Sequence, residues 1–151
     1  MVKYFVHLPY FFFTFIHLDN FSHHIGCGGT YLLEKNSPAV TMEIKTPNFP
    51  QMYPRNSQCE WTLKVPANHI IEFHVTSINM TNKDCINDHV DVFDPDVVAI
   101  TRFCGNETGS SYLSTSNVLK VIFRSGGGEV PTGYQYYGLR ATWKIGMEFN
   151  Q

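Results

Sequence analysis

The chain has 151 residues, of which 43% are hydrophobic and 16% are charged, and its formal net charge is −2 at pH 7. This composition supplies enough apolar material for one folded core and excludes a disordered chain. The 11 Lys and Arg residues form no cluster, which argues against a nucleic-acid partner. The length predicts one domain with extra residues at an end.

Residues 1–26 are predicted to lie outside the folded domain. An apolar, aromatic-rich run over residues 4–18 follows Lys3 and is interrupted by one proline and two histidines. A spanning helix needs about 18 or more apolar residues, so we predict no membrane span in this chain. The run fits the hydrophobic region of a signal peptide, although no small-x-small cleavage site precedes Cys27. The alternative is an unrelated upstream leader.

Four cysteines occur at wide spacing, and an even number of this kind fits either two disulfides or one four-ligand metal site. Zinc sites usually take two ligands from a tight Cys-x-x-Cys pair, which this chain lacks. We therefore favour disulfides, for which three pairings are open, and disulfides persist in oxidising compartments. The chain is expected to be secreted. The cysteines are Cys27, Cys59, Cys85 and Cys104.

Three Asn-x-Ser/Thr sequons support the same compartment, because this triplet is glycosylated only in the secretory pathway. They begin at Asn20, Asn79 and Asn106. Asn106 stands in the most loop-like context, within the stretch Gly-Asn-Glu-Thr-Gly-Ser. We predict a glycoprotein, with Asn79 and Asn106 as the glycosylation sites inside the domain.

After Cys27, apolar and polar residues alternate in short runs, which is typical of strands with one buried face. Turn-forming residues separate these runs, and no window has helical periodicity with caps. The pattern predicts an all-β sandwich or barrel, and periodicity does not choose between the two. The alternating runs are residues 61–65, 71–75, 90–92, 119–123 and 137–143.

Several short motifs then follow one another in a fixed order. They include CGGT at 27–30, TPNFPQMYP at 46–54, CEW at 59–61, CINDHVDV at 85–92, FCG at 103–105, VIFRS at 121–125 and YGLRATW at 137–143. This ordered set resembles the CUB domain family over residues 27–146. The resemblance implies a two-sheet, mostly antiparallel, jelly-roll-like β-sandwich with bridges Cys27–Cys59 and Cys85–Cys104. Residues 147–151 would then form a tail.

The resemblance also raises the question of calcium, because many CUB domains hold an ion that organises loops for capturing a basic side chain. The family pattern places carboxylates before the third cysteine, three residues after it, and in a late loop. Here Asp88 occupies the middle position, but Met80 or Thr81 and Gly126 occupy the other two. Calcium takes six to eight oxygen ligands, so we predict no family-type calcium site and no cofactor.

Asp84 or Glu129 could substitute as ligands only if the loops were rebuilt. We interpret the aspartates of this region as a solvated acidic edge with turn-forming residues. They are Asp84, Asp88, Asp91, Asp94 and Asp96.

The chain has no nucleophile elbow and no metalloprotease helix motif, so we predict no catalysis. Tyr134 and Tyr136 are either partner contacts or strand residues that fill the core. We expect an extracellular interaction module that recognises a protein or a glycan. It would be secreted or part of the ectodomain of a larger membrane or matrix protein. The alternatives are a regulatory part of a larger secreted protease and a free-standing ligand of the spermadhesin kind.

Overall fold

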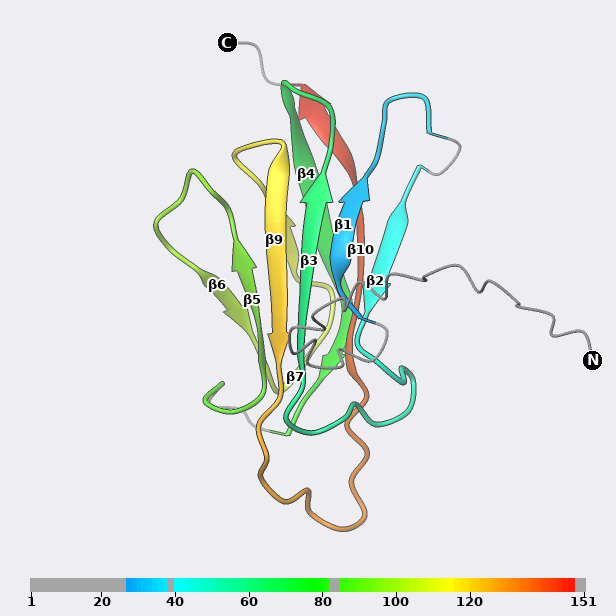
Figure 1. The fold of residues 1–151 in the computed structure, drawn as a ribbon, viewed down its shortest axis with the longest axis vertical. Coiled ribbons are helices and arrows are strands. Elements are labelled where there is room, and N and C mark those ends of the chain that lie inside the picture. The colour runs from blue at the N-terminus through cyan, green and yellow to red at the C-terminus, as the bar shows by residue number, and fades with distance from the viewer. Residues whose placement is uncertain (1–26, 38–39, 82–84, 149–151) are drawn as a thin grey trace, which may run out of the picture.

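The computed structural model describes residues 27–37, 40–81 and 85–148, which form ten strands in two facing sheets (Figure 1). Within these ranges, no helix is long and apolar enough to cross a membrane. The strands are β1 (Gly29–Leu32), β2 (Met42–Lys45), β3 (Gln58–Lys64), β4 (His69–Asn79), β5 (His89–Phe93), β6 (Thr101–Phe103), β7 (Asn106–Glu107), β8 (Ser111–Leu113), β9 (Val118–Arg124) and β10 (Gly138–Glu148).

The first sheet has the strand order β1-β3-β9-β5-β6, and the second has the order β2-β10-β4-β7 with β8 also paired to β4. All the pairings are antiparallel except that of β1 with β3. The predicted all-β, mostly antiparallel two-sheet sandwich is therefore confirmed.

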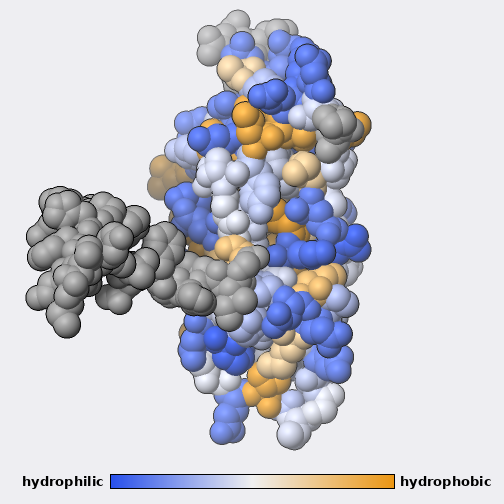
Figure 2. Space-filling model, turned by 45° about the vertical axis from the view of Figure 1, so that its right-hand side comes forward, coloured by the Kyte–Doolittle hydropathy of each residue, from blue (hydrophilic) through white to orange (hydrophobic). Residues whose placement is uncertain are grey.

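The core lies between the two sheets because alternate residues of each long strand point inward. Trp61 pairs with Val121 in the first sheet, and Phe73 pairs with Trp143 in the second, and all four are buried. The predicted alternating runs become β3, β4, β5, β9 and β10, although β10 begins one residue after Tyr137. On the face drawn in Figure 2, hydrophobic residues form separate areas between hydrophilic ones.

Two disulfides fasten the edges of this sandwich. The bridge Cys27–Cys59 joins the segment before β1 to β3, and Cys85–Cys104 joins the connection before β5 to the end of β6. These are the pairings that the family resemblance implied. None of the cysteines in the described part of the chain is free.

Three connections meet at one end of the sandwich, which is the lower end in Figure 1. They are residues 46–57 between β2 and β3, the described residues 80–81 and 85–88 between β4 and β5, and residues 125–137 between β9 and β10. This end is called the loop end below.

Candidate functional site

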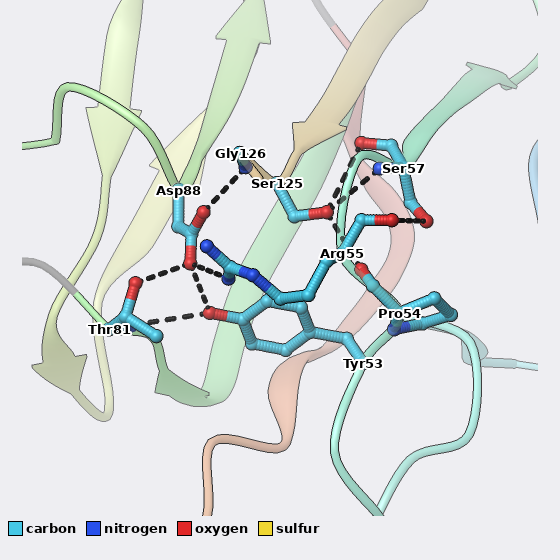
Figure 3. A network of polar contacts seen from close by, with 8 residues as sticks. All are labelled: Tyr53, Pro54, Arg55, Ser57, Thr81, Asp88, Ser125 and Gly126. Atoms are coloured by element: carbon cyan, nitrogen blue, oxygen red, sulfur yellow. Dashed lines mark hydrogen bonds and ion pairs between the residues drawn. The ribbon is translucent and has the colours of Figure 1, made fainter. Parts of the chain in front are cut away.

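A buried carboxylate, that of Asp88, lies at the centre of the loop end (Figure 3). The Tyr53 hydroxyl and the Arg55 guanidinium each donate to Oδ2 of Asp88 at 2.6 Å. The Thr81 hydroxyl donates to the same oxygen, and the backbone N–H of Gly126 donates to Oδ1 at 2.7 Å. All three connections of the loop end therefore converge on one carboxylate.

Two opposing effects act on the charge of Asp88. Burial alone would raise the pKa of this carboxyl, because it disfavours the charged form. The hydrogen bonds from Thr81, Tyr53 and Arg55, together with the Gly126 N–H, outweigh burial and hold the pKa of Asp88 below its ordinary value. Asp88 is therefore ionised at neutral pH, and Arg55 supplies the balancing positive charge at 2.6 Å.

Tyr53 is fixed between Asp88 and the core. Burial, followed by the hydrogen bond to the Asp88 carboxylate, raises the pKa of Tyr53 to about 12, so the hydroxyl keeps its proton and donates it. Its oxygen also accepts the backbone N–H of Thr81 at 3.2 Å. The Tyr53 ring meets the ring of Phe123 edge to face with 5.3 Å between centroids, which anchors it on the core.

Ser125 joins the first and third connections beside this network. Its hydroxyl donates to the carbonyl oxygen of Pro54 at 2.8 Å and accepts the backbone N–H of Ser57 at 2.9 Å. The Asn56 N–H also donates to the Gly126 carbonyl at 3.2 Å. A Cβ at Gly126 would come within 3.0 Å of the Asn87 Cβ, so this turn fits glycine closely.

The comparisons with known proteins agree with this fold. The family model of the CUB domain matches residues 27–137. The chain belongs to the CUB domain family. The match covers β1 to β9 and all three connections of the loop end, and it ends one residue before β10.

Curated relatives contain this domain within much longer chains. Mouse membrane frizzled-related protein is 33% identical over 107 residues, which are 67% of this chain and 17% of that protein. Human tolloid-like protein 2 is 32% identical over 105 residues, which are 67% of this chain and 10% of that protein. The chain thus spans less than a fifth of the length of either relative.

Solved structures share the CUB fold. The extracellular region of zebrafish Gpr126/Adgrg6 superposes with a TM-score of 0.61 at 25% identity, over 77% of this chain and 14% of that one. The MASP-1 CUB2 domain bound to Ca²⁺ superposes with a TM-score of 0.62 at 19% identity, over 78% of this chain and 99% of that one. The second likeness is evidence for the fold alone.

Apart from Asp88, the residues at the calcium positions of the CUB family offer no carboxylate in this chain. Met80 is buried in the core, Thr81 directs its hydroxyl proton to Asp88, and Gly126 presents an N–H donor. Calcium needs several acceptor oxygens, and here the partners of Asp88 are donors. Among the described residues, no group of three or more His, Cys, Asp or Glu side chains could hold a metal. Asp84 lies outside the described residues.

The predicted solvated acidic edge is wrong for three of its aspartates. Asp88, Asp91 and Asp94 are buried, whereas Asp96 is exposed as expected. Arg102 binds Asp91 through two hydrogen bonds, of 2.6 and 2.8 Å. Asp94 accepts the Thr115 hydroxyl at 3.0 Å. These carboxylates are buried because each has a donor partner, and sequence alternation does not reveal such partners.

Sequence reasoning missed two of the donors to Asp88. Arg55 was not named as a candidate, and Thr81 was named only as a position that lacks the family's carboxylate. The signal was present in part, because Arg55 directly follows the Pro-rich motif that contains Tyr53. In a chain that lacks two of the family's carboxylates, a cation beside that motif indicates that the remaining carboxylate is neutralised by a side chain of the same chain. Its partner Asp88 is 33 residues away along the chain, so only the fold identifies the pair.

The other predicted residues that the structure describes lie at the loop end of the CUB domain. Tyr134 is exposed and Tyr136 is half-buried, and both precede β10 rather than lying within a strand. Asn79 ends β4 and Asn106 begins β7. Asn20 falls outside the described residues. Glycosylation and partner contact at these positions stay predictions.

Proposed function

We propose that this chain is a non-catalytic extracellular interaction domain that recognises a protein or a glycan, and that Arg55 takes the place of calcium in organising its loop end. Membership of the CUB family supports the interaction role, since CUB domains are extracellular protein-interaction modules. The relatives, in which the matched region is a small part of a longer chain, support a modular role.

The observation that carries this proposal is the ion pair of Arg55 with Asp88. The Asp88 side chain is 0% exposed, and Nη1 of Arg55 lies 2.6 Å from Oδ2. One guanidinium balances the one carboxylate at this site, so a divalent ion has no uncompensated charge to attract it. A calcium ion would have to displace Arg55 and then find most of its oxygen ligands elsewhere.

The same pair changes how a partner can be held. In the family resemblance, a calcium-organised acidic site captures a basic side chain of a partner. Here Arg55 already fills that role within the chain, and both oxygens of Asp88 accept hydrogen bonds. Partner recognition is therefore assigned to exposed groups of the module, with the Asp88 network serving as the support that fixes the loops.

Thermal unfolding with calcium and with chelator tests this proposal. A ligand that binds only the folded state raises the unfolding midpoint, by a free energy of about 2.7 kcal/mol when its concentration is a hundred times its Kd. We expect the same midpoint for the full chain in millimolar calcium and in excess chelator. A calcium-dependent rise of several degrees would contradict the replacement of calcium by Arg55.

The interaction role needs a second measurement. The secreted chain, immobilised through its C-terminus, is exposed to extracellular fluid in calcium and in chelator, with reduced and alkylated chain as the control for unfolded binding. We expect one or more proteins or glycans to be retained equally in both buffers by the folded chain alone. Retention that disappears in chelator would contradict a calcium-independent module.

A further inference from the structure

A groove of about 240 Å³ at the loop end brings together residues that the sequence marked for two separate reasons. Asn79 and Asn106, the first residues of two sequons, line it together with Tyr134 and Tyr136. Thr81, which donates to Asp88, lies on the same wall, so the groove adjoins the buried network. Its lining is fixed from both sides, by β4 and β7 and by the connection before β10.

The two sequon asparagines are direct neighbours across an antiparallel strand pair. Asn79 of β4 pairs with Asn106 of β7, so their Cβ atoms are about 4.5–5.5 Å apart and point to the same face. That face is the outer one, because the preceding residue, Ile78, is fully buried in the core. Asn106 is exposed and Asn79 is half-buried, so Asn106 has the more accessible amide.

The two tyrosines form a stacked pair on the other wall of the groove. Their ring centroids are 6.1 Å apart, and the ring planes differ by 12°. Tyr136 is packed against the core, and its carbonyl oxygen accepts the Tyr53 N–H at 3.4 Å, which ties it to the fixed part of the loop end. Tyr134 lies outside it with 64% of its surface exposed. A flat aromatic surface therefore stands uncovered beside a sequon.

We propose that Asn106 carries an N-linked glycan whose first sugar lies in this groove and packs against Tyr134. The C–H groups on one face of a pyranose ring suit the electron-rich face of an aromatic ring. Packing a sugar there would cover the exposed tyrosine, and the sugar hydroxyls would face water. Tyr134 and Tyr136 are then the docking surface of the chain's own glycan and not the contact of a partner.

The covalent step needs a donor of a stated class, a lipid pyrophosphate-linked oligosaccharide of the secretory pathway. The side-chain amide nitrogen of Asn106 bonds to C1 of the first N-acetylglucosamine. The bond from C1 to the pyrophosphate oxygen breaks, the lipid pyrophosphate leaves, and the amide nitrogen loses one proton. This inference rests on the extracellular location in the proposed function, because only secretory passage supplies the donor.

The test uses the full chain secreted from eukaryotic cells in an Asn20→Gln, Asn79→Gln background, so that Asn106 carries the glycan alone. Glycopeptide mass spectrometry establishes its occupancy. The glycan is then released enzymatically under native conditions, and the melting temperature is compared before and after release. We expect release to lower the melting temperature by about 3 °C, as the loss of a modest packing contact would.

Two matched variants separate docking from a general effect of glycosylation. Tyr134→Ala removes the exposed ring without opening the core, and we expect glycan release to lower its melting temperature by about 3 °C less than it lowers that of the parent. Tyr134→Phe keeps the ring, and we expect it to behave like the parent. The Asn-to-Asp change left by the enzyme is common to all three proteins and cancels in the comparison.

The outcomes also separate this inference from the proposed function. An equal change in parent and Tyr134→Ala overturns docking, and so does a secreted, disulfide-bonded chain with Asn106 unmodified. In both cases the interaction role stands. A chain that is retained in the cell with free thiols overturns the extracellular proposal itself.

Discussion

Nη1 of Arg55 lies 2.6 Å from Oδ2 of Asp88, whose side chain is fully buried. The two residues come from different connections of the loop end and are 33 positions apart in sequence. Removing the cation would leave a buried carboxylate without a balancing charge, which lowers the free energy of unfolding. Substitutions at Arg55 are therefore expected to destabilise the domain.

Arg55→Met tests the cost of leaving Asp88 unpaired. Methionine keeps most of the aliphatic stem and removes the charge. We expect a loss of about 3–5 kcal/mol in the free energy of unfolding, as for other broken buried pairs. Urea unfolding followed by tryptophan fluorescence measures this loss.

Arg140→Met is the matched control for that substitution. Arg140 lies at the same distance, 2.6 Å, from a carboxylate oxygen of Glu43, but this pair is solvent-exposed. We expect a loss of about 0.2–1 kcal/mol, because water and salt screen exposed pairs. Equal losses for the two variants would mean that burial of Asp88 does not set the energy of its pair.

Tyr53→Phe removes one donor to Asp88 and one acceptor for the Thr81 N–H while keeping the ring against Phe123. Each lost hydrogen bond leaves a buried or half-buried polar group less satisfied. We expect a loss of about 1–3 kcal/mol in unfolding free energy, with no change in the denaturant slope. A neutral substitution would show that Thr81 and Arg55 satisfy Asp88 without Tyr53.

His89 makes the stability of the domain sensitive to mild acid. Burial lowers the pKa of His89 below its ordinary value of 6.5, and the nearby Asp91 carboxylate opposes this shift. Arg102 and Arg124 add to the lowering, and Arg102 already holds Asp91 through two hydrogen bonds. Within the described residues, neither ring nitrogen of His89 has a hydrogen-bond partner.

The sign of this effect follows from proton uptake. The unfolded chain protonates His89 near pH 6.5, whereas the folded chain protonates it only at lower pH, so the unfolded state binds more protons between the two values. The contribution of His89 is therefore fully present above pH 6.5 and is lost as the pH falls through the folded-state pKa. We expect unfolding free energy to decline more steeply between about pH 7 and pH 5 in the parent than in His89→Gln. Parallel declines in urea titrations would rule out this role.

Removing either disulfide tests how much the bridges stabilise the sandwich. The bridges close sequence separations of 32 and 19 residues. The chain-entropy model predicts a loss of roughly 3–4 kcal/mol for each paired Cys→Ala replacement, with the longer loop costing slightly more. Thermal unfolding of Cys27→Ala/Cys59→Ala and Cys85→Ala/Cys104→Ala checks the order. A larger loss at Cys85–Cys104 would indicate that this bridge also supports the loop end.

The strands could be predicted from the sequence because the signal for each is local. Alternation in residues 61–65 and 119–123 predicts one buried face, and Trp61 and Val121 are indeed buried neighbours on the paired strands β3 and β9. The motif order also indicated the CUB fold and the bridge pairing. The exact start of β10 was missed by one residue, since Tyr137 fits the alternation but lies before the strand.

The buried polar contacts of the domain could not be predicted in the same way. Asp88, Asp91 and Asp94 were expected in solvent because a charged side chain is buried only when it has partners. Those partners come from elsewhere in the sequence, for instance Arg55 for Asp88 and Arg102 for Asp91. Local sequence carries no record of which distant donor will meet a given carboxylate.

The sequence by itself determined the sandwich, the two disulfides and the absence of a full set of carboxylates at the family's calcium positions. Periodicity predicts the strands, and residue identity shows the missing carboxylates. The sandwich and the pairing of the bridges follow from the resemblance of the ordered motifs to the CUB family. Only the tertiary structure decided that Arg55 neutralises Asp88 and that Asn106 shares a groove with Tyr134. The physical reason is that ion pairs and grooves depend on distances across connections, and folding alone sets these distances.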